Sequence, residues 1–205
     1  MQNQKVHPQN LVKARFFIDG RHQRARCPSM FFSYYPTEYF SFKLNKDSFN
    51  SLYVIDLNGI IRYISDAYLA ARNDSSIFSI EREKILKFLK NLLILDGHPD
   101  DPVIILSDGG FPSNSEEIIN KQKLKCSKVQ TKIFQSSRNK VEQTFGHQAN
   151  VFRSTRQRFE FSSKHIDDFQ KAAAFLVNIH IKLHPISLKY QEIFEAYAFQ
   201  SIDEE

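Results

Sequence analysis

The hydrophobic positions of the chain fall into two patterns, short continuous runs and longer stripes at helical spacing. The first run covers residues 15–20 and ends in Asp19 and Gly20. Apolar runs bounded by turn residues are typical of buried strands, so we predict a strand with a carboxylate at its C-terminal end. A second run, residues 103–106, is followed by Asp108 and two glycines and predicts another strand of this kind.

Three further strand-like segments lie between these two runs, at residues 40–44, 51–56 and 60–65. The link between the last two segments contains Asn58-Gly59, and Asn-Gly is the strongest short-range signal for a β-hairpin. We therefore predict that these two strands pair antiparallel.

Two segments carry apolar residues at the spacing of a helix that packs on a sheet. The first, residues 76–95, has a predicted core face of Ile77, Ile80, Ile85, Phe88, Leu89 and Leu92, with Glu81, Glu83 and Lys87 on the opposite side. The second, residues 167–183, has a predicted core face of Phe169, Ala172, Ala173, Leu176 and Ile179.

A third helical stripe lies between these two and passes through Phe134, Val141, Phe145, Ala149 and Phe152. Glu142 follows Val141 directly and precedes Phe145 by three residues. Residues at these spacings share or adjoin one helix face, so we place the Glu142 carboxylate at the edge of the buried face.

The order of elements is strand, antiparallel strands, helix, strand, helix, helix, which predicts an α/β layer domain with a mixed sheet. Sites in such sheets form at the carboxyl ends of strands, where Asp19 and Asp108 fall. A length of 205 residues with 41% hydrophobic content suits a single core. We expect an N-terminal extension, a folded domain and a C-terminal tail, at residues 1–14, 15–184 and 185–205.

The sequence carries no sign of a membrane or secreted protein. No apolar run approaches the roughly 18 residues that a membrane helix requires, and the first thirty residues contain no signal-peptide core. Cys27 and Cys126 are too few for a disulfide framework or a cysteine zinc site. We expect a soluble intracellular protein that is not secreted.

Positive charge is concentrated in one part of the chain. Residues 121–164 contain eleven Lys or Arg against Glu142 and Glu160, a net +9, whereas the whole chain carries +5. Such segregated charge suits a polyanion, because each neutralised phosphate releases counterions. The alternative from charge alone is a solvated basic helix face. For DNA binding, the expected backbone contacts are Lys125, Lys128, Lys132, Lys140, Arg153, Arg156 and Arg158.

Asp19, Asp108 and Glu142 are candidate ligands for divalent metal ions. Phosphodiester cleavage typically uses a pair of metal ions about 4 Å apart. Magnesium prefers oxygen ligands and keeps several waters, so two or three carboxylates on separate elements suffice if the strands are neighbours. Taken singly, each residue also has a plainer explanation, because Asp often starts turns and a Glu on a helix flank is usually solvated.

The three acidic residues lie in longer motifs. Asp19 lies in Ile-Asp-Gly-Arg-His, Asp108 in Leu-Ser-Asp-Gly-Gly-Phe-Pro, and Glu142 in Arg-Asn-Lys-Val-Glu-Gln-Thr-Phe-Gly. In order and spacing these motifs resemble those of the nuclease domain of Harbinger-type transposases, whose catalytic residues are Asp, Asp and Glu. Asp108 and Glu142 are 34 positions apart, close to that family's usual separation. Arg21 stands where the family's first motif has Thr.

Two further segments are similar to the same family. Residues 54–61 resemble its hairpin, and residues 73–78 resemble its His-Asp-Ser-x-x-Phe segment, with Asn73 in place of His. The resemblance covers roughly residues 15–182. It implies a ribonuclease-H-like fold with a mixed sheet flanked by helices.

The resemblance also implies a chemistry. Asp19, Asp108 and Glu142 would hold Mg²⁺ or Mn²⁺, with two ions expected, while a water or a DNA 3′-hydroxyl attacks the phosphorus in line. Supporting residues around these ligands are expected to be His22, Asp74 and Arg138, although a structural turn role for Asp74 and a surface ion pair for Arg138 stay open. The implied substrate is DNA, in the nucleus or cytoplasm.

Two functional hypotheses remain from the sequence. The first is a metal-dependent DNA endonuclease or strand transferase. Since only eighteen residues precede Asp19, we expect no helix-turn-helix region that reads the DNA sequence. A separate DNA-binding partner protein would then direct the nuclease to its target. The second is an inactive domesticated or truncated transposase remnant that acts as a DNA-binding or protein-interaction module. Retention of all three acidic residues favours the first, and a homo-oligomer is compatible with either.

Overall fold

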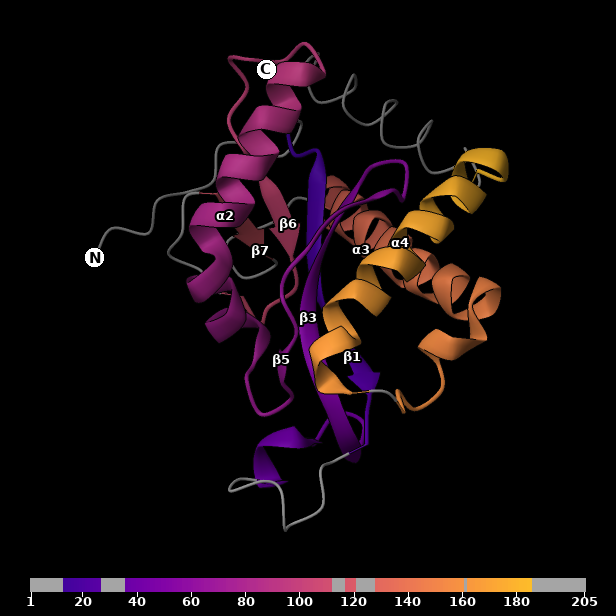
Figure 1. Cartoon of the computed structure of the whole chain (residues 1–205). Helices are drawn as coiled ribbons and strands as arrows, with labels where there is room; N and C mark the ends of the chain where they lie inside the picture. The colour runs from indigo at the N-terminus through magenta and orange to yellow at the C-terminus, as the bar shows by residue number, and fades with distance from the viewer. Residues whose placement is uncertain (1–12, 27–35, 112–116, 121–127, 161, 186–205) are drawn as a thin grey trace, which may run out of the picture.

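The chain forms one mixed sheet with helices on both faces (Figure 1). The structure is a computed structural model, and the part it describes comprises residues 13–26, 36–111, 117–120, 128–160 and 162–185, without the side chains of residues 36 and 128–138. This arrangement confirms the predicted mixed α/β architecture and is consistent with a ribonuclease-H-like fold. No helix in the described part is long and apolar enough to cross a membrane.

Strand β1 (Phe16–Arg24) lies at the centre of the sheet. On one side it pairs antiparallel with β3 (Lys46–Asp56) along its whole length. On the other side it runs parallel to β6 (Ile105–Ser107), which in turn runs parallel to β7 (Ile118–Asn120). The two predicted strands are therefore neighbours. Because β1 continues to Arg24, Asp19 lies within the strand and not, as the sequence predicted, at its C-terminal end.

Three short strands pair with β3: β2 (Phe40–Ser41), β4 (Ile61–Ile64) and β5 (Tyr68–Leu69). The predicted hairpin is confirmed as β3–β4. Its turn is held by Asp56, whose Oδ1 accepts the N–H groups of Asn58 at 2.8 Å and Ile60 at 2.9 Å. Gly59 in this turn has φ of 81°, a conformation that favours glycine.

Strand β3 begins earlier than the sequence predicts and includes buried polar residues, namely Ser48, Asn50 and Ser51. Ser51 donates from Oγ to Gln170 Oε1 at 2.8 Å, and Asn50 donates from Nδ2 to Arg72 O at 3.1 Å. Buried polar groups are tolerated when they are hydrogen-bonded, so these residues continue the strand without alternating apolar positions.

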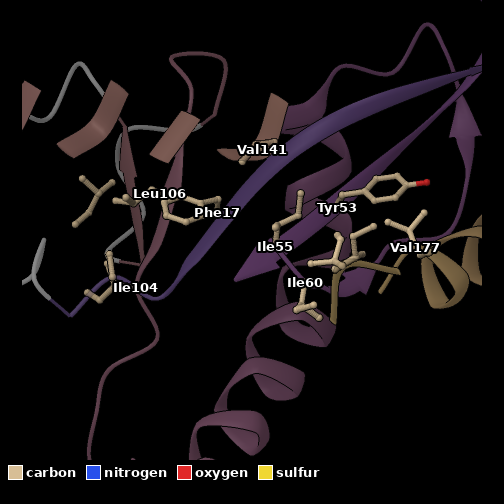
Figure 2. Close-up of a cluster of buried hydrophobic side chains, with 13 residues drawn as sticks. Phe17, Tyr53, Ile55, Ile60, Ile104, Leu106, Val141 and Val177 are labelled. Atoms are coloured by element: carbon tan, nitrogen blue, oxygen red, sulfur yellow. The ribbon is translucent and has the colours of Figure 1, made fainter. Parts of the chain in front are cut away.

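The alternation of side chains along β1 divides the core into two layers. Phe16 and Ile18 pack with α2 (Asp74–Leu95) on one face of the sheet. Phe17 points to the other face, where α3 (Lys128–Val151) and α4 (Ile166–Leu183) cover it. Figure 2 shows this second layer, in which Phe17, Tyr53, Ile55 and Leu106 of the sheet lie with Val141 of α3 and Val177 of α4.

The predicted core face of α2 is partly wrong. Its buried residues are Ile77, Phe78, Glu81, Ile85, Leu89 and Leu93, whereas Ile80 and Phe88 are exposed. Glu81 was expected on the solvent side but is fully buried. Its carboxylate accepts hydrogen bonds from Tyr68 Oη at 2.5 Å, Tyr63 Oη at 3.1 Å and Lys84 Nζ at 3.2 Å. These partners replace water and allow the charge to lie beneath the helix.

The predicted core face of α4 is also partly wrong. The helix buries Ile166, Gln170, Ala173, Ala174, Val177 and Ile181. Leu176 and Ile179, which were expected inside, are exposed, as is Ala172. Apolar residues occur nearly all round this helix, so their spacing alone does not select one face; the hydrogen bond between Gln170 and Ser51 helps to select it.

Replacing Glu81 by Ala should destabilise the fold by about 2 to 3 kcal/mol, because two tyrosine hydroxyls lose their buried acceptor. Burial alone would raise the pKa of Glu81, but the hydrogen bonds from Tyr68, Lys84 and Tyr63 outweigh it and lower the pKa. Because the pKa of Glu81 is lower in the folded protein than its usual value of 4.5, the ionised carboxylate stabilises the fold at pH values above 4.5. This stabilisation is lost as the pH falls below 4.5. Urea denaturation at about pH 7 and pH 3.5 measures both effects.

The matched control is Glu83→Ala on the exposed side of α2, which should change the free energy of unfolding by under about 0.5 kcal/mol. Equal effects of the two substitutions at neutral pH would contradict a stabilising role for the buried carboxylate.

Candidate active site

The parallel pairing of β1 with β6 brings two of the predicted acidic residues together. The last pair of that ladder joins Ile18 to Ser107, so Asp19 and Asp108 are the next residues along the two strand paths. Helix α3 packs on both strands. Glu142 from this helix lines, together with both aspartates, a cavity of about 370 Å³. The three predicted acidic residues thus share one pocket.

Each aspartate of the pocket is held by a neighbouring backbone amide. Asp19 Oδ1 accepts the N–H of Gly20 at 2.9 Å, and Asp108 Oδ1 accepts the N–H of Gly110 at 2.9 Å. Within the described part of the chain, no Lys or Arg forms an ion pair with either carboxylate. The two aspartates are therefore oriented by backbone amides and have no ion-pair partner among the described Lys and Arg residues.

The electrostatics of the pocket act most strongly on Asp19. Burial raises the pKa of its carboxyl group from 3.8 to about 6, against the opposing charge of Lys43. The nearby carboxylates Asp108 and Asp74 raise the pKa further, and the Gly20 amide lowers it. Ionised Asp19 is thus an unfavourable charge in the folded protein, and a cation bound beside it would relieve that cost.

Asp74 reaches this part of the sheet because residue 20 is glycine. A Cβ at Gly20 would lie 2.1 Å from Asp74 Oδ1, so any side chain there would displace the carboxylate. Asn50 Nδ2 donates to the same oxygen at 2.7 Å. Asp74 also opens α2, where the Asn73 side chain caps the helix by accepting the Ser76 N–H at 2.8 Å. Its position combines a structural role with proximity to Asp19.

His22 lines the pocket from the same strand as Asp19. Its Nδ1 lies 3.3 Å from Ser48 Oγ, a hydrogen bond whose direction depends on the ring tautomer. Burial is the main cause that lowers the pKa of the His22 imidazole, with Asp74 opposing and Lys43 reinforcing this effect. The neutral ring is therefore the favoured form in the pocket at neutral pH.

The donors of the pocket fit a hard divalent cation in their chemistry. They are carboxylate oxygens on separate elements, and the aspartates lack Lys or Arg ion-pair partners in the described structure. No group of three His, Cys, Asp or Glu side chains in that part converges closely enough to form a complete metal-binding cluster. Since Mg²⁺ retains several water ligands, a partial set of carboxylates suffices to bind it.

The predicted DNA-contacting residues have different outcomes. Arg153, Arg156 and Arg158 are exposed; Arg156 donates to Asn150 Oδ1 at 2.7 Å, and Arg158 lies 3.4 Å from Glu160 Oε1. Lys140 is buried, and its ammonium donates to the carbonyl oxygen of Leu57, so it does not face the solvent. The other predicted contacts are not described: the side chains of Lys128 and Lys132, and the whole of Lys125, lie outside the described structure. The same is true of the side chain of Arg138, which was predicted to support the metal ligands.

Two basic residues that the sequence did not single out as site residues also line the pocket, Arg21 and Lys43. Arg21 follows Asp19 by two residues on a strand, and the two-residue period places both side chains on one face of the sheet. That signal was present in the sequence. Lys43 lies in the turn between β2 and β3, and no pattern in the sequence connects this turn to Asp19.

Replacing Asp19 by Asn should stabilise the metal-free protein, because it removes an unfavourable buried charge and keeps an oxygen for the Gly20 amide. A folded-state pKa raised to about 6 means that stability is lost as pH rises from 3.8 through 6. We expect a gain of about 1 to 3 kcal/mol at about pH 7.5, with none below about pH 4. Urea denaturation in the presence of EDTA measures it.

Asp100→Asn, at an exposed position, is the control and should stay within about 0.5 kcal/mol of the wild type at either pH. A loss of stability in Asp19→Asn at about pH 7.5 would show that the carboxylate stabilises the metal-free fold and would contradict this account of the pocket.

Comparison with known proteins gives one match. The sequence model of the family described as DDE superfamily endonuclease matches residues 18–178, which is most of the chain and includes all three acidic residues. No curated protein and no solved structure matches the chain. Enzymes of this superfamily generally use divalent metal ions and act on DNA. From the match and the shared pocket we conclude that the chain belongs to the DDE superfamily endonuclease family, as a transposase-type nuclease domain.

Proposed function

We propose that this domain cuts or transfers DNA phosphodiesters with Mg²⁺ or Mn²⁺ and that it is of the Harbinger type. The observation that carries the proposal is the meeting of Asp19, Asp108 and Glu142 on one pocket, with Asp19 and Asp108 left without Lys or Arg partners in the described structure. The family match and the acidic motifs support the same chemistry.

The roles of the residues follow from their positions. Asp19 and Asp108 would hold the cations, and Glu142 would complete the ligand set from α3. When bound, the ions activate the attacking oxygen and neutralise charge on the phosphate. The backbone amides of Gly20 and Gly110 fix one oxygen of each aspartate and leave the other available as a ligand.

Residues around the carboxylates would support this arrangement. His22 and Asp74 would orient the ligands or their waters, because His22 lines the pocket and Asp74 contributes to the raised pKa of Asp19. Arg138, one helical turn before Glu142, is proposed as a further supporting residue.

The DNA backbone is proposed to follow the basic surface beside the pocket. The exposed Arg153, Arg156 and Arg158 are available for phosphate contacts, and their exposure supports this role. Lys125, Lys128 and Lys132 stay in the proposed set on charge alone, and Lys140 is left out because it is buried. A separate DNA-binding protein would supply target recognition, and a DNA substrate favours the nucleus as the place of action.

The proposal predicts that Mg²⁺ or Mn²⁺ binds the purified chain with millimolar or tighter affinity and that the loaded protein nicks supercoiled plasmid. Asp108→Asn should lose both, because it removes a ligand charge from the pocket. Calorimetry measures binding, and gel electrophoresis measures nicking.

The control is Asp168→Asn, an exposed residue in the first turn of α4, which should bind metal and nick DNA as the wild type does. A folded wild-type chain that binds neither ion would overturn the catalytic proposal and favour an inactive remnant that acts through DNA or protein binding.

A further inference from the structure

The guanidinium of Arg21 lies inside the carboxylate pocket and is held there by three side chains. It lies over the ring of Phe145, with Cζ 5.3 Å from the ring centroid, and 6.0 Å from the centroid of Tyr53. Its Nη2 donates to Thr155 Oγ1 at 3.2 Å. These three contacts restrict the position of the guanidinium in the pocket.

This positive charge is not matched by a negative one within the described structure. Nη1 of Arg21 is buried there without a hydrogen-bond partner, and no carboxylate forms an ion pair with the side chain. Burial lowers the pKa of the Arg21 guanidinium, yet arginine stays protonated in proteins. A buried cationic donor without an acceptor is costly to the fold, and an anionic ligand in the pocket would supply the acceptor.

A second cation lines the same pocket from another element. Lys43 belongs to the turn that joins β2 to β3, in which the Leu44 N–H donates to Ser41 Oγ at 3.3 Å and Asn45 adopts φ of 52°. The charge of Lys43 acts on both Asp19 and His22. The pocket therefore combines acidic residues suited to metal ions with two cations, Arg21 and Lys43.

We propose that Arg21 and Lys43 form a phosphate-binding subsite that holds a phosphodiester of the DNA strand beside the carboxylates. Arg21 is the positioning residue, because the planar fork of a guanidinium pairs with two phosphate oxygens at once. The proposal rests on the proposed function. It goes beyond the family resemblance, since Thr occupies the position of Arg21 in the family's first motif and a Thr side chain is too short to lie on Phe145.

The test measures binding of a short fluorescein-labelled DNA duplex by anisotropy, in EDTA, over a series of salt concentrations. Each phosphate contact contributes about 0.9 to the slope of log affinity against log salt. Arg21→Met should lower that slope by about 1, and Lys43→Met should lower it as well. Arg21→Lys should keep the slope but weaken binding, because lysine keeps the positive charge but cannot pair with two phosphate oxygens at once as a guanidinium does. Arg24→Met, an exposed arginine at the end of β1, is the matched control.

A second readout separates phosphate binding from a structural role. Without DNA, Arg21→Met should melt at the same temperature as the wild type or higher, because it removes an unpaired buried charge and keeps an apolar stem over Phe145. A lower melting temperature, a misfolded variant, or equal slopes in Arg21→Met and wild type would overturn the proposal, as would a wild-type chain that binds no DNA. Because EDTA removes metal ions, this DNA-binding measurement does not depend on metal binding. Failure of the proposed metal site in the calorimetry experiment can therefore be distinguished from failure of the phosphate subsite.

Discussion

The parallel pairing of β1 with β6 is the constraint on which the site depends. It places Asp19 next to Asp108 where the β1–β6 ladder ends, and the two carboxylates repel each other there. Burial adds to this cost and raises the pKa of Asp19 to about 6. The fold supports the arrangement with two large apolar layers on the sheet, and a cation is the natural counterpart of the remaining charge.

The polar groups around this pair are arranged so that the charge is oriented but not cancelled. The N–H groups of Gly20 and Gly110 donate to one oxygen of each aspartate. Gly20 also leaves room for the Asp74 carboxylate, which accepts a hydrogen bond from Asn50. Arg21 contacts Phe145 and Thr155 and forms no ion pair with the pocket carboxylates in the described structure. By contrast, the buried carboxylate of Asp56 is paired with Arg62 at 2.7 Å. This difference supports the proposals that the pocket binds metal ions and a phosphate.

The sequence predicted the parts of this structure that depend on local pattern. The strand that contains Asp19, the strand before Asp108, the β3–β4 hairpin and the three helices follow from runs, turn residues and helical stripes, although the sequence ended the first strand at Asp19 and Gly20 while β1 continues to Arg24. The sharing of one pocket by Asp19, Asp108 and Glu142 could be expected only from the family resemblance, because strand neighbours are not encoded in spacing.

The errors come from polar residues whose partners lie far away in the sequence. Burial of Glu81 is stabilised by hydrogen bonds from Tyr63 and Tyr68 of the sheet. Burial of Lys140 is stabilised by its hydrogen bond to the carbonyl oxygen of Leu57. None of these three partners can be identified from a helical pattern. Strand β7 was missed because its apolar run is only Ile118 and Ile119, too short for a strand signal.

The central claim is that the paired carboxylates of β1 and β6 bind divalent metal. Crystals soaked in Mn²⁺ and measured for anomalous scattering test it most directly, because manganese is located independently of the protein atoms. The account predicts an anomalous peak within bonding distance of Asp19 and Asp108, about 2.0 to 2.3 Å from a carboxylate oxygen. An anomalous peak for fully occupied manganese at another site, with no peak in this pocket, would contradict the claim.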